Sequence, residues 1–166
     1  MKKYIPLILI SIAICILGYR IYLVQSLNMN MTAYLERAAN ASTIELATNE
    51  IKTSLCYLEN NNMTSGHTSI FFEDPTEDVE FWYTNLKTTL TELENSSHAS
   101  TLEKTNVLLK LKHTLLTNKG KVKKPQGLEV YPNNTIWAML VTMSIVIGLV
   151  GFILISSLKT IEKNEI

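Results

Sequence analysis

The strongest constraint on this chain is a run of 23 residues without a single charge, Ile136 to Leu158 ("IWAMLVTMSIVIGLVGFILISSL"). A helix of about 20 residues crosses the ~30 Å hydrocarbon core of a bilayer, so this run is long enough to span it. Helices in the core of globular proteins are seldom so long and so free of charge. The pattern predicts a transmembrane helix over residues 135–158.

A second apolar run lies near the other end, Ile5 to Val24, and only Arg20 interrupts it. Arg20 stands near the end of this run, where a long side chain reaches the headgroups. A cleaved signal peptide is the alternative interpretation, because a basic start and an apolar middle are typical of one. No small-x-small cleavage signal follows, so we expect a retained transmembrane helix over residues 5–24.

Two spans place both termini on one side of a membrane and residues 25–134 on the other. The predicted cytoplasmic tails, 1–4 and 159–166, carry Lys2, Lys3, Lys159 and Lys163, which favours termini inside the cell. Four lysines between Lys119 and Lys124 argue for the opposite orientation. A loop longer than about 60 residues crosses largely regardless of charge. We therefore expect an integral membrane protein whose central domain is extracytoplasmic, in a periplasm or lumen.

The central residues carry helical patterns. Between about Asn28 and Asn60 the apolar residues recur at spacings of three, four or seven, without Gly or Pro, which predicts one long amphipathic helix. Its predicted core residues are Ala38, Ala41, Ile51, Leu55 and Leu58. The stretch "ENNNMTSGHTS" should end it, because Asn and Gly tolerate left-handed backbone.

The stretch "FFEDPTEDVEFWY", residues 71–83, gathers five carboxylates among five aromatic residues. Asp74, Pro75 and Glu77 fit the N-cap, N1 and N3 positions of a helix with a capping box. Acidic residues in the first turn also suit the positive end of the helix dipole. The pattern predicts that a helix starts at Asp74, and Phe72 is expected to pack as a hydrophobic staple.

Two further helices complete the domain, one after Asp74 and one from Ser100, with Glu103 as capping-box partner, to about Asn118. We predict an all-α membrane protein in which two transmembrane helices flank an antiparallel three-helix extramembrane bundle, residues 25–118. Residues 119–134 should return to the membrane as an extended strap. The predicted core of the second and third helices is Val79, Trp82, Tyr83, Leu86, Leu90, Leu93, Leu108, Leu111 and Leu115; Leu102, Leu109 and Leu116 belong to the same broad apolar face.

No cofactor or metal is expected. A calcium site at Glu73, Asp74 and Asp78 is the alternative interpretation of the acidic segment 73–80, but the segment lacks a calcium-loop pattern and Pro75 stiffens it. The three histidines fall at no zinc-ligand spacing. Cys15 lies in the first span, so a disulfide with Cys56 is implausible, and Cys56 is expected to be at least partly buried.

The net acidic charge of the central residues argues against nucleic-acid binding. Residues 25–134 hold 13 acidic and 10 basic residues, and no aromatic residues interleave with the basic ones. The only basic cluster is "KGKVKK" in the strap. A surface for polyanions or anionic headgroups is its alternative interpretation, beside a solvated linker.

Small residues recur along one face of each span. Ser11, Cys15 and Gly18 occupy positions i, i+4 and i+7 of the first span, and Ser144, Gly148 and Gly151 do so in the second. Small residues let membrane helices approach closely. We expect these faces to pack against each other or against a partner.

The run "YLERAANASTIELATNEIKTSLCYLENNNMTSGHTSI", followed by "FWYTNLK" and "LEKTNVLLKL", resembles a family of small uncharacterised membrane-anchored proteins of cyanobacteria. The similarity covers about residues 34–134, and "FWYTNLK" is its most distinctive piece. The resemblance implies a bacterial membrane and no particular activity, so it assigns no functional residue.

Three function classes remain. The first is a structural, assembly or accessory subunit, whose partners are the bilayer and either another protein or further copies of this chain. The second is an extracytoplasmic sensory module, which with eight residues after Leu158 would lack its own output domain. An enzyme is not expected, because no nucleophile elbow, metalloprotease motif, phosphate loop or pair of catalytic carboxylates occurs.

Overall fold

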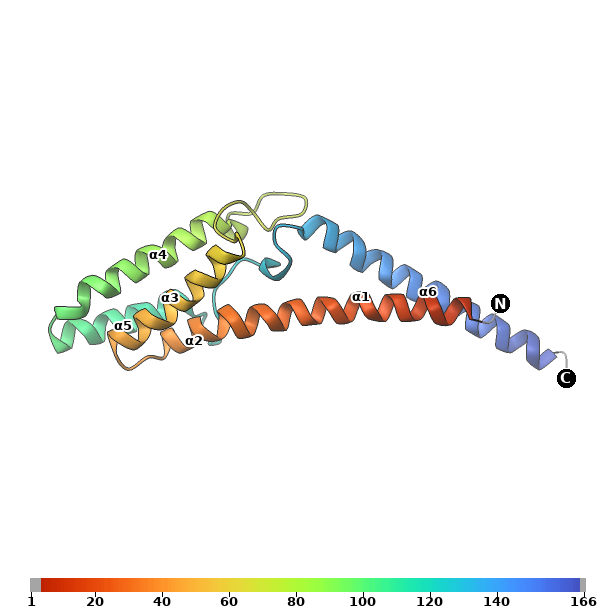
Figure 1. The fold of residues 1–166 in the computed structure, drawn as a ribbon, viewed down its shortest axis with the longest axis horizontal. Helices are drawn as coiled ribbons and strands as arrows, with labels where there is room; N and C mark the ends of the chain where they lie inside the picture. The colour runs from red at the N-terminus through yellow and green to blue at the C-terminus, as the bar shows by residue number, and fades with distance from the viewer. Residues whose placement is uncertain (1–3, 165–166) are drawn as a thin grey trace. The chain divides into compact units, whose positions relative to one another are not determined.

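The computed structural model describes residues 4–164, and within them the chain is helical, with no β-strand and two isolated bridges. It divides into two compact units, one of residues 1–24 and 133–166 and one of Gln25–Pro132. Figure 1 shows the order of the helices. Of the predicted tails, residues 1–3 and 165–166 lie outside the described residues.

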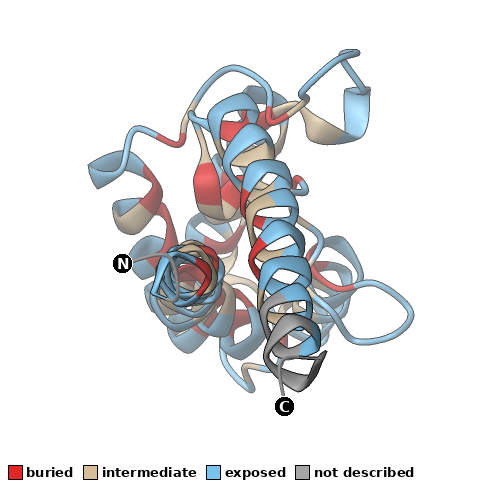
Figure 2. Cartoon of the chain, turned by 90° about the vertical axis from the view of Figure 1, so that its right-hand side faces the viewer, coloured by how far each residue is buried: buried red, intermediate tan, exposed pale blue. Residues whose placement is uncertain are grey.

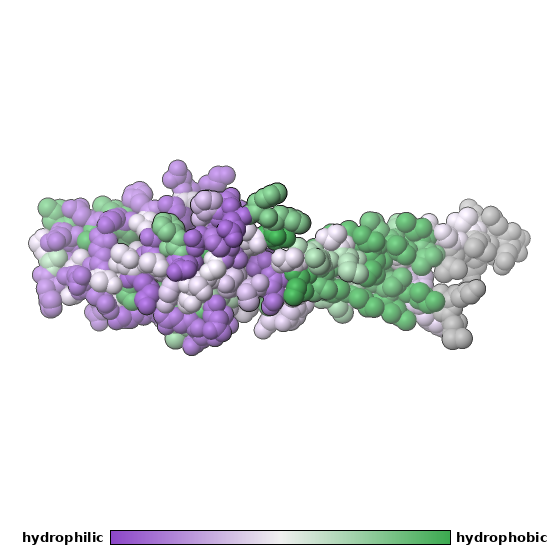
Figure 3. All heavy atoms as spheres, turned by 90° about the horizontal axis from the view of Figure 1, so that it is seen from above, coloured by the Kyte–Doolittle hydropathy of each residue, from purple (hydrophilic) through white to green (hydrophobic). Residues whose placement is uncertain are grey.

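The first unit contains α1 (Ile5–Leu27) up to Val24, and α6 (Asn134–Asn164). Both helices are long and apolar enough to cross a membrane, with mean hydropathies of 2.4 and 2.7 over their most apolar windows. Only 6% and 11% of those windows are buried, whereas a core helix of a soluble protein is mostly buried. Figure 2 shows how much of both helices is exposed, and Figure 3 shows hydrophobic residues concentrated on them.

The helix that begins at Ile5 continues without interruption to Ala39. Along it α1 passes into a π-helical turn, η1 (Asn28–Thr32), and then into α2 (Ala33–Ala39). The second unit continues with α3 (Ile44–Asn60), the 3₁₀ turn η2 (Pro75–Glu77) and α4 (Val79–Asn95). The turn η3 (Ser96–His98) leads to α5 (Thr101–Leu115), and η4 (Leu128–Val130) precedes α6.

The prediction of one helix from Asn28 to Asn60 is wrong. The helix ends at Ala39 and restarts at Ile44, so that α2 and α3 pack against each other. The break needs neither Gly nor Pro. The Asn40 amide donates to the Glu36 carbonyl at 2.8 Å, and the Thr43 hydroxyl caps α3 by accepting from the Leu46 amide at 3.2 Å.

This break gives the second unit four helices, so the predicted three-helix bundle is not confirmed. The helix α2 packs against α3 and α5, and α3 packs against α4. The buried core runs through all four helices and the loops that follow α3 and α5. Its fully buried members, all below 2% exposed, include Leu27, Met31, Leu35, Ala38, Ala47, Ile51, Leu58, Val79, Leu93 and Leu128.

The structure places the predicted core residues as follows. Ala38, Ile51, Leu55, Leu58, Val79, Leu86, Leu93, Leu111 and Leu115 are buried, and Ala41, Trp82, Tyr83, Leu90 and Leu108 are half-buried against that core. The sequence pattern missed Met31, Leu35 and Ala47, which lie beside the unexpected π-turn and the unexpected break.

The segment after α5 is folded rather than simply extended. Leu116 and Val122 form an isolated bridge around a tight turn in which the Thr117 and Gly120 backbones are hydrogen-bonded. Pro125 and Leu128 are buried. The predicted strap is therefore part of the packed second unit up to Pro132.

Candidate functional site

The acidic segment before α4 does not start a helix where the sequence pattern predicts. Asp74 caps only the short turn η2, by accepting from the Thr76 amide at 2.8 Å. The α-helix begins after Asp78, whose carboxylate accepts from the Phe81 amide at 2.8 Å. Asp78 is held extended by an isolated bridge to His67, and this bridge prevents a continuous helix from Asp74.

Local hydrogen bonds occupy the carboxylates of this segment. Those from Thr76 hold the pKa of the Asp74 carboxyl below its usual value. The Glu77 carboxylate accepts from the Ser69 hydroxyl at 2.8 Å, and so does not close a capping box with Asp74. Among the described residues no three His, Cys, Asp or Glu side chains lie close enough to hold a metal ion, and the calcium interpretation gains no support there.

A groove of about 750 Å³ opens where α3 begins, α4 ends and α5 begins, and we call it the α3–α5 groove. Apolar side chains form part of its lining, and Glu94 and Lys104 supply opposite charges at its walls. Lys52 of α3 pairs with Glu94 of α4 at 2.7 Å beside it. Its lining residues are Ser42, Thr43, Ile44, Glu45, Thr48, Asn49, Leu93, Glu94, Ser97, Thr101, Lys104, Thr105 and Leu108.

A second groove, of about 470 Å³, separates α4 from α5, which diverge from the turn that joins them (Figure 1). Lys110 of α5 donates to both carboxylate oxygens of Glu92 at 2.6 and 2.8 Å. The Trp82 indole donates to the Lys123 carbonyl at 2.9 Å, which ties α4 to the segment after α5. These contacts therefore join α4 to α5 and to the segment that follows α5, and their residues line the groove.

Part of the apolar face of α5 is left uncovered. Leu108, Leu111 and Leu115 pack on the core, but Leu102 is 73% exposed and Leu109 is 53% exposed. These two leucines are seven residues apart, and therefore lie on one side of the helix. They are adjacent on the helix to Thr101 and Thr105, which line the α3–α5 groove. The sequence analysis placed both leucines on the broad apolar face of this helix but not among its core residues, and the structure leaves them exposed.

The titratable pair Tyr83 and Glu59 joins α4 to α3. The Tyr83 phenol donates to a Glu59 carboxylate oxygen at 2.5 Å. Partial burial and then the neighbouring carboxylate raise the pKa of Tyr83 to about 12. The phenol stays protonated at neutral pH, so this pair acts as a structural link.

The two small-residue faces of the spans do not meet. On α6 a Cβ added at Gly151 would lie 2.9 Å from Ile10 and 3.1 Å from the Pro6 carbonyl, and Ser144 is fully buried. On α1, however, Ser11 and Cys15 are exposed, and Gly18 has nothing within 4 Å of an added Cβ. The contacts use Pro6, Leu9, Ile10 and Ala13 of α1 instead.

The expectation that Cys56 is buried is wrong. Its side chain is exposed on α3 and lies 3.4 Å from the Asn60 amide nitrogen, which donates to it. Both cysteines are free thiols.

No protein family, curated protein or solved structure matches this chain significantly.

Proposed function

We propose that this chain is a membrane-anchored accessory or assembly subunit, and that its central helical unit binds another protein or a second copy of itself. In this proposal α1 and α6 span the bilayer, both termini are cytoplasmic and the unit Gln25–Pro132 is extracytoplasmic. The anchoring part is supported by two exposed helices of sufficient length and hydropathy.

The observation that carries the proposal is the exposure of Leu102 and Leu109 beside the α3–α5 groove. A single exposed leucine is ordinary, but these two lie on one side of α5, beside Thr105 of the groove of about 750 Å³. Leu46 on α3 is also 50% exposed. An amphipathic helix of a partner would place its apolar side chains against such a groove.

In this proposal the charges around the groove give selectivity. Lys104 stands at one wall, and Glu45 and Glu94 also line the groove. Exposed charges contribute little affinity, but they slow the association of partners with the wrong charge pattern. Contacts to Leu102 and Leu109 would provide the affinity for the partner, and the charged residues would determine which partner binds.

The proposal is tested by purifying the native full-length chain in mild detergent and identifying what comes with it by mass spectrometry. Leu102→Glu with Leu109→Glu should remove the bound protein or dissociate the oligomer. The matched control is Thr84→Glu with Thr91→Glu, which places two charges seven residues apart on the exposed face of α4. Recovery of the wild-type chain only as a monomer would contradict the proposal.

A sensory role is the second candidate, and the same groove favours it. Its volume lies within the range of about 300–1,000 Å³ that is usual for small-molecule sites. A small polar ligand that raises the Tm of the wild-type protein, but not that of a Thr105→Trp variant, would support this role, because Thr105 is exposed and lines the groove. Retention of a protein partner by wild type alone would favour assembly.

The proposed orientation can be tested at Cys56. Its thiol is exposed, so an impermeant maleimide should label it in intact cells. Cys15 lies within a proposed span and should stay unlabelled. If Cys56 reacts only after the cells are lysed, the central unit is cytoplasmic.

A further inference from the structure

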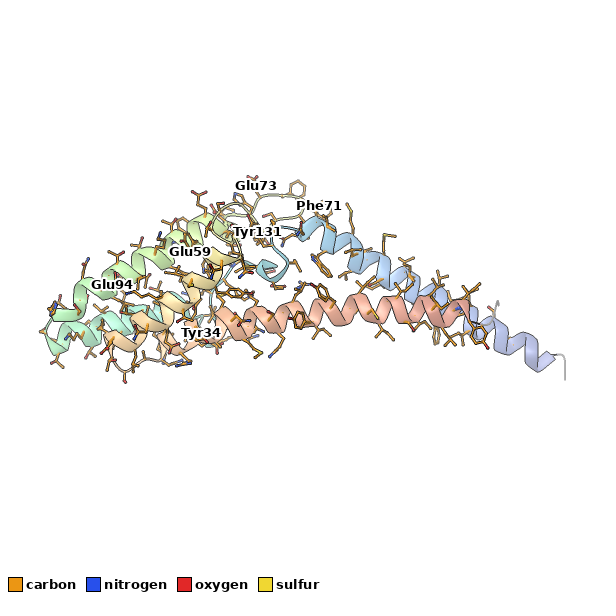
Figure 4. The ribbon with its side chains drawn as sticks, in the orientation of Figure 1. Tyr34, Glu59, Phe71, Glu73, Glu94 and Tyr131 are labelled. Atoms are coloured by element: carbon orange, nitrogen blue, oxygen red, sulfur yellow. The ribbon has the colours of Figure 1, made fainter. Side chains whose placement is uncertain are left out.

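The loop between α3 and α4 carries the most exposed aromatic pair in the described part of the chain. Phe71 is 88% exposed and Phe72 is 89% exposed, and the preceding Ile70 is 42% exposed. Figure 4 shows Phe71 standing out from this loop. The expected staple between Phe72 and the start of α4 is therefore not formed, and we call Ile70–Phe72 the apolar tip.

Two backbone hydrogen bonds form a stem at the base of the apolar tip. The Thr68 amide donates to the Glu77 carbonyl at 3.0 Å, and the Val79 amide donates to the Gly66 carbonyl at 2.8 Å. Thr68 is only 2% exposed, so the base of the loop is buried in the second unit. Because these hydrogen bonds join the two sides of the stem, the phenylalanines are held away from the protein core.

The same stem is attached to the residues that lead into α6. The Tyr131 phenol donates to the Ser65 carbonyl, and a Cβ at Gly66 would lie only 2.6 Å from the Tyr131 oxygen. Tyr131 is three residues before Asn134, where α6 begins. The apolar tip therefore belongs to the end of the second unit from which the chain enters α6.

Aromatic residues in the first unit indicate where the membrane–water interface lies along the spans. Tyr19 stacks on Trp137 with ring centroids 5.6 Å apart, and on Tyr22 at 5.9 Å. Tyrosine and tryptophan concentrate at the headgroup level of membrane proteins. From Tyr131 to Trp137 the chain can reach at most about 15 Å, since three residues are extended and three are helical.

We propose that the apolar tip inserts into the interfacial layer of the same bilayer that α1 and α6 cross, as a third, non-spanning contact with lipid. Glu73 and Asp74 follow the tip directly and are exposed, so they limit its depth to the headgroup boundary. They also make zwitterionic lipids a better surface than anionic ones. The inference rests on the proposed spans but not on a protein partner.

The experiment uses the full-length chain in phosphatidylcholine nanodiscs, with Cys15→Ser and Cys56→Ser. A nitrobenzoxadiazole fluorophore is attached at Phe71→Cys, and in a control protein at Thr91→Cys. Both positions are exposed, so neither substitution removes core packing, and Thr91 lies on α4 twelve residues after the start of that helix, outside the proposed protein-binding surface. Nitroxide-labelled lipids report direct contact with the bilayer.

We expect blue-shifted emission at position 71 and quenching by lipids that carry the nitroxide near the headgroup, with neither effect at position 91. Replacing phosphatidylcholine with phosphatidylglycerol should reduce the quenching. Emission at position 71 equal to that at position 91 would overturn the inference. So would a blue shift without lipid quenching, because the tip would then be buried against protein. A chain that alkaline carbonate leaves in the membrane, but whose position 71 is unquenched, disproves only this inference.

Discussion

The hydroxyl of Ser54 donates to the backbone carbonyl of Met31, 23 residues away, at 3.2 Å, and shares its proton with the Glu50 carbonyl of its own helix at 3.3 Å. Met31 lies in the π-helical turn η1, and such turns leave carbonyl groups displaced from the regular helical ladder. Both residues are fully buried. The Ser54 side chain thus gives a partner to a carbonyl that water does not reach, and fixes α3 against the helix that continues from α1.

Replacing Ser54 with Ala should lower the free energy of unfolding of the second unit by about 1–2 kcal/mol, because the Met31 carbonyl loses a buried partner. The measurement is thermal unfolding of the full-length protein, followed by circular dichroism. The control is Thr53→Ala, since the exposed Thr53 hydroxyl bonds only to the Asn49 carbonyl of its own helix. Equal effects of the two substitutions would contradict the role of Ser54.

The contact between Gly66 and Tyr131 gives a second prediction. Gly66→Ala introduces a Cβ 2.6 Å from the Tyr131 oxygen at a φ of +82°, whereas Gly120→Ala enters open space at a φ of +73°. Both substitutions cost about 1 kcal/mol for the left-handed backbone. Gly66→Ala should cost about 1–2 kcal/mol more, because the Tyr131–Ser65 hydrogen bond must break.

Chemical denaturation of the two alanine variants measures that difference. Combining Gly66→Ala with Tyr131→Phe should cost less than the sum of the two single changes, since both remove the same hydrogen bond. Additive effects would show that the close approach of Gly66 to Tyr131 contributes nothing.

The raised pKa of Tyr83 predicts a pH dependence of stability. A folded-state pKa of about 12, above the ordinary 10.0, means that folding favours the protonated phenol. Its contribution is therefore complete below about pH 10 and is lost as the pH rises toward 12. The measurement is a spectrophotometric pH titration of wild type and Tyr83→Phe. The difference between their phenolate absorbances should appear at a pH well above 10.0, the pKa of an ordinary tyrosine. If the missing absorbance titrates near pH 10, the link to Glu59 is not formed.

The packing of α1 on α6 predicts a specific disulfide. In a chain with Cys15→Ser and Cys56→Ser, the pair Ala13→Cys and Gly148→Cys should cross-link on mild oxidation, because the two Cβ positions are 3.5 Å apart. The pair Gly18→Cys and Gly148→Cys should not, since no neighbour lies near Gly18. Mobility on a non-reducing gel distinguishes them. Preferential cross-linking at position 18 would show that α1 packs through the Ser11, Cys15 and Gly18 face, as the sequence predicts.

Much of the helical architecture follows from the sequence, because a charge-free run and periodic leucines are strong local signals. The helix break at Asn40–Thr43 does not, since Asn, Ser and Thr fit a cap and a helix surface almost equally well. The same ambiguity misplaced the start of α4, where Asp74 and Asp78 both satisfy an N-cap pattern. Only the bridge between His67 and Asp78, a nonlocal contact, selects Asp78.

The candidate surfaces were harder to predict for a related reason. Periodicity shows that Leu102, Leu109 and Leu111 are apolar, but not how wide a stripe the neighbouring helices cover. Leu102 and Leu109 line neither groove and remain exposed, so the helices that pack on α5 cover only part of its apolar stripe. The position of Phe72 before the predicted N-cap likewise fits a hydrophobic staple. In the structure, however, the stem of the loop directs Phe72 outward.

Extraction of cellular membranes with alkaline carbonate tests the central claim most directly, because carbonate releases proteins held only at the surface. We predict that the full-length chain stays entirely in the membrane pellet and is released only by detergent. Recovery of the chain in the carbonate supernatant would contradict the two spans, and with them the proposed anchoring of the helical unit.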